Sequence, residues 1–223
     1  MFVGHYAVSF AARSTSVPLP LWVWFVAVQW LDVVFMTLVL VGVEKVRLTE
    51  GFTESNDLDL YYMPFTHGLA GALVLSVVFA AIVAVVFPAG RRPLAFWLVA
   101  LASFSHWLLD LVMHTPDLPL LGDDSTKVGL GLWEHVAIGF PLELVLLGLA
   151  MLLYARSVNL VGRSGRVILL AFFAFMAAAQ VYGTFGPTPG STEEFAGSAL
   201  AGYVLLAALA AWVERRAVVK HAR

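Results

Sequence analysis

Ionisable side chains interrupt long apolar runs at a few positions of the sequence. Asp32 stands in VQWLDVVF, Glu143 in FPLELVL, and both His106 and Asp110 in SHWLLDLVMH. An acidic side chain near the centre of a bilayer costs about 2.5–3.5 kcal/mol on insertion scales. Residues of this kind therefore face the interior of a helix bundle, where they pair with one another or bind an ion.

The stretch from His106 to His114 carries imidazole, carboxylate and imidazole at intervals of four residues, with Asp110 in the middle. On an α-helix, side chains four residues apart lie about 40° apart around the axis and about 6 Å apart along it. The three side chains therefore form one stripe. Side chains at i and i+4 can share a metal ion, as the paired histidines of the HExxH motif do.

Depth in the membrane places further residues beside this stripe. Asp32, Glu143 and His106 each lie about ten residues, or ~15 Å, from the outer ends of their apolar runs. Asp110 and His67 lie somewhat nearer the outer boundary. Helix bundles build metal sites from carboxylates and histidines that project inward from facing helices. The chain has no cysteine, so nitrogen and oxygen would be the ligands, which suits zinc, manganese or iron.

Six apolar runs must position these residues. They span residues 19–43, 67–87, 94–112, 135–154, 167–182 and 197–213. An α-helix needs about 20 apolar residues to cross the bilayer, and each run is near that length, the fifth being the shortest. Proline lacks the amide donor that a helix interior needs, and breaks containing proline separate several runs. We therefore expect an all-α polytopic membrane bundle of about six transmembrane helices.

Composition supports a single integral membrane domain over residues 1–223. Of the 223 residues, 61% are hydrophobic and 13% are charged, and the mean hydropathy is +0.87. A soluble domain carries about 25% charged residues. We expect the polar site within residues 1–155 and a C-terminal hairpin of two spans in 156–223. The net charge of −2 argues against a nucleic-acid partner, and membrane lipids are the expected surroundings.

The basic residues set the orientation of the six spans. Ten fall on one side: Arg13, Arg91, Arg92, Arg156, Arg163, Arg166, Arg215, Arg216, Lys220 and Arg223. Three fall on the other: Lys45, Arg47 and Lys127. The basic side is cytoplasmic, so both termini are predicted to be cytoplasmic. His5 then lies opposite the other candidate ligands, unless residues 1–12 enter the membrane as a helix.

The stretch SHWLLDLVMHTPDLPLL, together with GHYAVSF, the Asp32 segment, YYMPFTHG and GLGLWEH, resembles a known family. This is the YdjM-like family of bacterial inner-membrane proteins described as metal-dependent hydrolases, and the resemblance covers about residues 1–155. The order of motifs is also similar to that of the all-helical zinc-dependent phospholipase C fold. The matching residues, in order, are His5, Asp32, His67, His106, Asp110 and His114. The late HxxxE element departs from that fold, because His135 and Glu143 are eight residues apart.

The resemblance implies a hydrolase in the bacterial inner membrane whose divalent ion, zinc before manganese or iron, is held by those six residues. Glu143 would be the general base, or else the residue that orients a ligand. A site near the outer boundary, beside the apolar loop at 118–121, suits a lipid or lipid-linked phosphoester on the extracytoplasmic side.

Two alternatives belong to other classes of protein. In a proton- or cation-coupled transporter, Asp32, Asp110 and Glu143 would form a relay. In a non-catalytic membrane scaffold, the polar cluster would only fix the packing of the helices. The inner half of the spans is nearly bare of polar residues apart from Gln29 and Ser103, which favours a closed site over a pathway.

Overall fold

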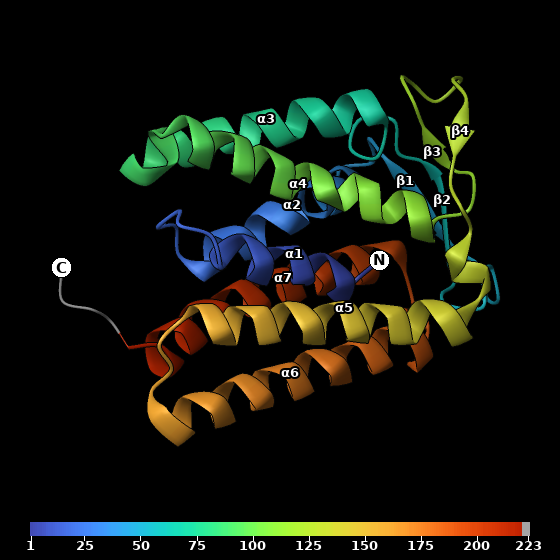
Figure 1. Cartoon of the computed structure of the whole chain (residues 1–223). Helices are drawn as coiled ribbons and strands as arrows, with labels where there is room; N and C mark the ends of the chain where they lie inside the picture. The colour runs from blue at the N-terminus through green and yellow to red at the C-terminus, as the bar shows by residue number, and fades with distance from the viewer. Residues whose placement is uncertain (220–223) are drawn as a thin grey trace.

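The computed structural model describes residues 1–219 and is a bundle of helices lying side by side (Figure 1). The helices are α1 (Val3–Arg13), α2 (Leu21–Leu40), α3 (Leu69–Val86), α4 (Pro93–Met113), α5 (Val136–Ser157), α6 (Gly162–Phe185) and α7 (Thr192–Ala217). The helices α2 to α7 are long and apolar enough to cross a membrane. The prediction of an all-α bundle with six membrane spans is therefore confirmed.

Caps and helix-breaking residues, rather than apolarity, decide where the spans end. The first run was expected at 19–43, but α2 begins after Pro20 and ends before Gly42, whose φ of +76° suits glycine. The sixth run was expected at 197–213, but α7 is longer at both ends. The Ser191 hydroxyl accepts a hydrogen bond from Glu194 N (3.1 Å), and Arg215 lies in the last turn.

The short helix α1 lies inside the bundle instead of crossing it. Its 11 residues extend about 16 Å, roughly half of a span. It begins among the other helices, as Figure 1 shows, and runs toward the end of the bundle where α2 starts. There the Arg13 side chain pairs with Glu214 of α7 (Nε to Oε1, 2.5 Å). Residues 1–12 therefore enter the bundle as a helix. Met1 is buried beside Asp110, in contrast to its predicted cytoplasmic position.

Large apolar side chains fill the half of the bundle in which α1 ends. Trp24 and Phe25 of α2, Phe10 of α1, Tyr154 of α5 and Phe172 of α6 belong to one buried cluster. The Phe25 and Phe172 rings stack with their centroids 5.9 Å apart. This packing holds α1 against the spans on every side, so the position of the helix is fixed by the core.

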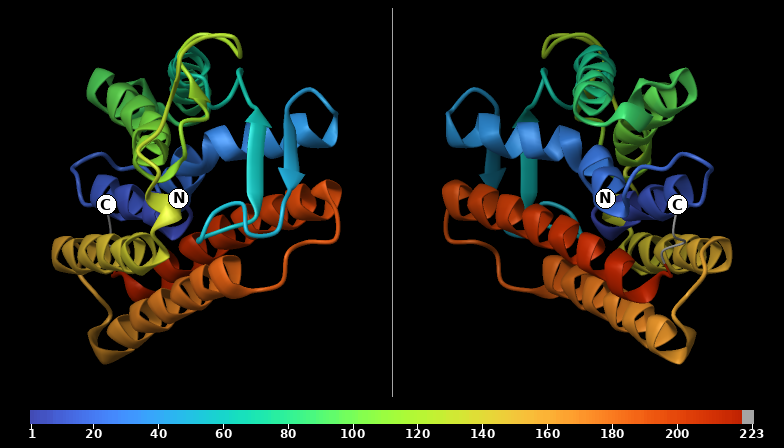
Figure 2. Two further views of the ribbon diagram at one scale, coloured as in Figure 1. Left: turned by 90° about the vertical axis from the view of Figure 1, so that its right-hand side faces the viewer. Right: turned by 90° about the vertical axis from the view of Figure 1, so that its left-hand side faces the viewer.

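Two small antiparallel hairpins cover the opposite end of the bundle (Figure 2). The first pairs β1 (Lys45–Leu48) with β2 (Leu58–Tyr62), and the second pairs β3 (Leu118–Pro119) with β4 (Lys127–Val128). A short 3-10 helix, η2 (Leu132–Glu134), leads into α5, and another, η1 (Pro88–Arg91), joins α3 to α4 at the far end. The sequence analysis did not predict these strands, because each has five residues or fewer and lies between apolar runs.

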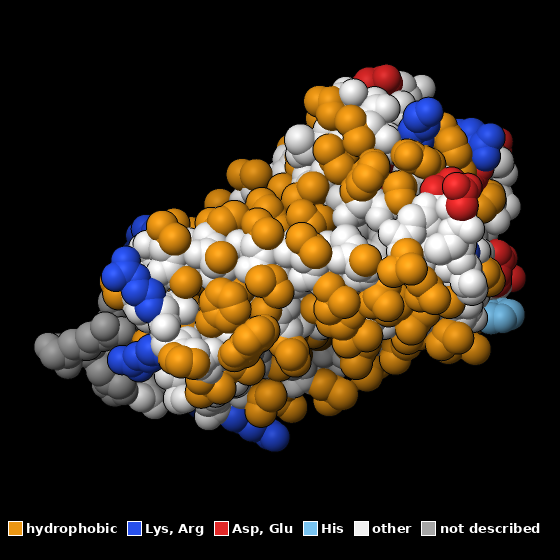
Figure 3. Space-filling model, turned by 90° about the horizontal axis from the view of Figure 1, so that it is seen from above, with side chains coloured by type: hydrophobic (Ala, Val, Ile, Leu, Met, Phe, Trp, Pro, Cys, Tyr) orange, Lys and Arg blue, Asp and Glu red, His pale blue; other side chains and the backbone are white. Residues whose placement is uncertain are grey.

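Charge is distributed unequally between the two ends of the bundle. Figure 3 shows Lys and Arg gathered at one end, and Asp, Glu and a histidine together with further Lys and Arg side chains at the other. The basic end holds Arg13, Arg156 and Arg163, where α1 and α5 end and α6 begins. The hairpins therefore lie at the end that the charge bias predicts to be extracytoplasmic.

This orientation can be tested with single cysteines, because the chain contains none of its own. Asp124→Cys, in the exposed β3–β4 loop, is expected to react with a membrane-impermeant maleimide in intact cells. Ser164→Cys, at the start of α6, is expected to react only after the membrane is opened. The cysteine-free chain is the blank, and labelling of Ser164→Cys in intact cells would reverse the assignment.

Candidate metal centre

Six polar residues from separate parts of the chain meet between the helices. They are His5 of α1, Asp32 of α2, His67 just before α3, His106 and Asp110 of α4, and His114 at the end of α4. All are buried except Asp32, whose side chain is 15% exposed. The structure thus brings together the whole set of ligands expected from the sequence. Whether they bind a metal stays a prediction.

Asp110 lies at the centre of this cluster, between four imidazoles. Its Oδ2 is 3.0 Å from Nε2 of His106 and 3.6 Å from Nε2 of His67. Its Oδ1 is 3.1 Å from Nε2 of His5 and 3.8 Å from Nε2 of His114. The two oxygens therefore serve different pairs of histidines. The main-chain nitrogen of residue 1 also donates to Oδ1 (2.9 Å).

Asp32 adds a second carboxylate on one side of the cluster. Its Oδ1 is 3.4 Å from Nε2 of His67 and 3.4 Å from Nε2 of His106. Its Oδ2 accepts a hydrogen bond from the Tyr203 hydroxyl (3.0 Å), which fixes the carboxylate. One ligand atom from each of Asp32, His67 and His106 lies within 4.8 Å of the others. Another such group joins His106 to His5 and Asp110.

In two of the histidines, the ring nitrogen that faces away from the cluster, Nδ1, contacts an acceptor on a neighbouring segment. Nδ1 of His106 is 2.7 Å from the carbonyl oxygen of Val28, and Nδ1 of His114 is 2.9 Å from Oδ1 of Asp117. An acceptor at Nδ1 places the ring proton there and leaves the Nε2 lone pair facing the cluster. Histidines that bind metals show this arrangement, because the second interaction fixes both the tautomer and the ring orientation.

A longer chain of contacts holds His67. Its Nδ1 lies 2.9 Å from the Thr66 hydroxyl, which donates its own proton to Oε2 of Glu44 (2.6 Å). The hydroxyl oxygen can therefore accept the Nδ1 proton. Oε1 of Glu44 accepts the backbone N–H groups of Phe65 and Thr66 at 2.8 and 3.0 Å. Glu44 is 1% exposed, and the sequence analysis did not single it out. No local pattern marks it, since its partners are mostly backbone groups.

Unpartnered nitrogen atoms show whether a metal suits this set of residues. Among the described residues, His106 Nε2 and both ring nitrogens of His5 are buried without a hydrogen bond of acceptable geometry. The His5 and His106 rings are stacked, with centroids 3.8 Å apart and planes 6° apart. A buried polar atom without a partner costs about 1–3 kcal/mol. A divalent cation beside the two carboxylates would satisfy the Nε2 atoms of His5 and His106, so the residues fit the expected ion.

Glu143 lies beside the amino end of α1 instead of beside the imidazoles. Its Oε2 accepts the backbone N–H groups of Phe2 (2.8 Å) and Gly4 (3.0 Å). Gln180 of α6 accepts the N–H of Val3 (3.3 Å). The first N–H groups of a helix have no partner within the helix, and in a membrane no water replaces one. Glu143 and Gln180 therefore cap α1. The roles predicted for Glu143, as the general base or as the residue that orients a ligand, both stay predictions.

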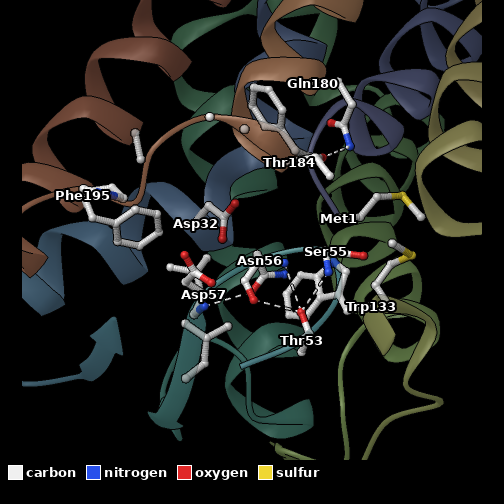
Figure 4. Close-up of a pocket in the computed structure, with 18 of the residues that line it drawn as sticks. Met1, Asp32, Thr53, Ser55, Asn56, Asp57, Trp133, Gln180, Thr184 and Phe195 are labelled. Atoms are coloured by element: carbon white, nitrogen blue, oxygen red, sulfur yellow. Dashed lines mark hydrogen bonds between the residues drawn. The ribbon is translucent and has the colours of Figure 1, made fainter. Parts of the chain in front are cut away.

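A cavity of about 480 Å³ opens beside the cluster (Figure 4). Asp32, His67, Asp110 and His114 lie on its inner wall. Its outer wall is the segment 53–57 between β1 and β2, together with the α6–α7 loop at 186–189. Residues 198–203 of α7 also line it. The site was expected within residues 1–155, but Gln180 and Tyr203 show that the last two spans contribute to it. Neither side chain is ionisable within the physiological range, which is why composition did not mark them.

Comparison with family models, with curated proteins and with solved structures finds no match for this chain. The resemblance to the YdjM-like family and to the phospholipase C fold therefore stays a prediction, and the site rests on its own geometry.

The capping role of Glu143 leads to a testable difference between two substitutions. Glu143→Leu removes the acceptor for Phe2 and Gly4, and each buried N–H left unpaired is expected to cost about 1–3 kcal/mol. Glu143→Gln keeps an acceptor oxygen and is expected to lose less. Thermal unfolding of the two variants in detergent measures this difference. Equal stability of the leucine variant and the wild type would contradict the capping role.

Proposed function

We propose that this chain is a membrane-bound, metal-dependent hydrolase whose site lies in the extracytoplasmic half of the bilayer. The observation that carries the proposal is the position of Asp110 among four Nε2 atoms. Three of the four histidines also have an acceptor at Nδ1, which turns their Nε2 atoms toward the cluster.

The first ion would be held by Asp32, His67, His106 and Oδ2 of Asp110. These are two nitrogen donors and two oxygen donors, a set that suits zinc and also manganese or iron. Such an ion supplies Lewis acidity to a phosphoryl oxygen and promotes ionisation of a water molecule near neutral pH. The chain's own part is to hold the donors rigidly through Val28, Thr66 and the Tyr203 hydroxyl.

A second ion would lie on the other side of Asp110, with His5 and His114. Oδ1 of Asp110 faces these two histidines, whereas Oδ2 faces His67 and His106. Asp110 would thus help to hold both ions, and a pair of ions would supply charge stabilisation for a phosphoester, as in many phosphoester hydrolases. In this proposal Glu143 acts through α1, because it fixes the helix that carries His5.

The surroundings of the cluster support a lipid or lipid-linked phosphoester as substrate. The cavity combines the acidic and imidazole wall with apolar side chains, among them Phe35, Leu60 and Phe195. Ligand pockets usually pair a few placed polar groups with a mostly apolar lining. A phosphoester headgroup would contact the polar wall and its hydrocarbon would contact the apolar one.

The packing of the inner half supports hydrolysis over coupled transport. A relay would need polar groups that continue from Asp32 and Asp110 toward the basic end of the bundle. Over the described residues, that half is filled by the aromatic cluster around Phe10, Phe25 and Phe172, and buried polar side chains within it, such as Ser9, Gln29 and Ser103, carry no charge. The cluster of carboxylates and imidazoles therefore ends within the membrane.

Metal content is the first test of the proposed centre. Purified wild-type protein, loaded with zinc and analysed by plasma mass spectrometry, is expected to retain two ions per chain. His5→Ala is expected to retain one, and the double variant His106→Ala/Asp110→Ala none. His135→Ala is the matched control, since this exposed histidine lies outside the cluster. Equal metal in the double variant and the control would refute the centre.

Hydrolysis is the second test. Metal-loaded protein in mixed micelles is expected to release product from a phospholipid or a polyprenyl-phosphate ester. His106→Ala is expected to reduce turnover to background, because His106 would supply one of the two nitrogen donors of the first ion. His135→Ala should retain wild-type turnover. If His106→Ala turned over substrate as fast as His135→Ala, this mechanism would be wrong.

A further inference from the structure

The outer halves of α6 and α7 pack against different partners. In α6, Phe185 contacts Phe140 of α5, with ring centroids 5.3 Å apart. In α7, Ala196 is buried in a cluster with Phe35 and Met36 of α2. The inner halves of the same two helices share one cluster that includes residues 169, 172, 206 and 210. The two helices therefore meet near the basic end and separate toward the outer end.

The cavity beside the candidate metal centre occupies the space between these outer halves. Ala179 and Gly183 of α6 line it on one side, and Ser198, Ala199 and Gly202 of α7 line it on the other. Gly183 and Ser198 are exposed, so the cavity reaches the surface of the bundle between the two spans. These five small residues, which we call the α6–α7 slot, leave room beside the helix backbones. Both helices are candidate membrane spans, so the slot faces hydrocarbon.

The aqueous end of the cavity is crossed by the segment 53–57. Ser55 N donates to the carbonyl oxygen of Trp133 (3.1 Å), and Val136 N donates to Oε2 of Glu54 (3.1 Å). On the other side, the Thr188 hydroxyl of the α6–α7 loop donates to Asp57. These bonds fasten the segment to the start of α5 and to the α6–α7 loop. Figure 4 shows Ser55, Asn56 and Asp57 of this segment beside Asp32.

We propose that the α6–α7 slot admits one acyl chain of a membrane phospholipid from the outer leaflet into the cavity. The cavity, at about 480 Å³, is at the low end of ligand pockets, so most of a phospholipid must stay in the bilayer. The slot connects the cavity with the bilayer, whereas the segment 53–57 obstructs approach from water. A chain in the slot leads inward to Asp32, whose side chain, at 15% exposed, is the less buried carboxylate of the cluster. The identity of this lipid as substrate rests on the proposed function, whereas its binding does not.

Photochemical crosslinking tests the slot directly. The wild type is reconstituted into vesicles of phosphatidylethanolamine and phosphatidylglycerol that contain a trace of phosphatidylglycerol with a diazirine on one acyl chain. Crosslinks are expected on peptides covering 179–183 and 198–202. Gly183→Trp fills the slot and is expected to lower crosslinking there about tenfold. Gly197→Trp is the matched control, because an added Cβ at either glycine meets no atom within 4 Å, and Gly197 does not line the cavity.

Ser198→Trp fills the slot from the opposite wall and serves if Gly183→Trp does not fold. Crosslinking of the slot peptides that is equal in the filled variants and in Gly197→Trp would overturn the proposal. So would crosslinking spread evenly over all six spans of the wild type.

Hydrolysis separates this inference from the proposed function. Gly183→Trp is expected to lose about tenfold or more of its turnover of dioleoyl phosphatidylglycerol. Gly197→Trp should turn over this lipid as the wild type does, because Gly197 does not line the cavity, and both variants should retain the wild-type zinc content. Wild-type turnover of this lipid by Gly183→Trp would overturn the slot. Absence of hydrolysis in the wild type would defeat the proposed function, and the crosslinking result would still decide the slot.

Discussion

The burial of the Asp110 carboxylate is the constraint on which the arrangement of this bundle depends. A carboxylate that is 2% exposed inside a membrane bundle is tolerated only where donors or cations surround it. One helix can supply such groups only along its own stripe, so the others must come from elsewhere in the chain. His5 arrives on a helix that begins inside the bundle, His67 on the segment before α3, and His114 from the point where α4 ends. The requirements of one side chain thus explain why the fold includes a half-length helix.

The loops at the outer end are part of the same arrangement. Glu44 is buried below β1, where it holds two backbone N–H groups and the Thr66 hydroxyl behind His67. Asp117, in the turn after α4, contacts Nδ1 of His114, the ring nitrogen that faces away from the cluster. The backbone of the spans alone would leave each histidine ring free to adopt any of its rotamers. The loops fix the direction of each Nε2, which is the property that a metal ligand needs.

The sequence predicts the spans well because bilayer thickness imposes a length that few other structures share. It also predicts His106 with Asp110, since helical periodicity places them on one face, and Asp32, since its insertion cost demands partners. Glu44 and Gln180 escape prediction because their partners are backbone groups far away in the chain. The position of α1 escapes it as well. Eleven residues are too few for a span, and the charge rule assigns a side of the membrane but does not describe a helix that stops halfway.

The caps of α1 have a consequence for the order in which the protein is assembled during synthesis. Glu143 and Gln180 belong to the fourth and fifth spans, which leave the ribosome long after His5. Until these two spans are inserted, the first N–H groups of α1 have no acceptors in the hydrocarbon. The helix α1 is therefore not stable inside the membrane before that point. The first histidine to be synthesised is therefore among the last to be placed. The centre closes only when most of the chain has been inserted, so truncated chains or chains stalled after α4 lack a complete ligand set.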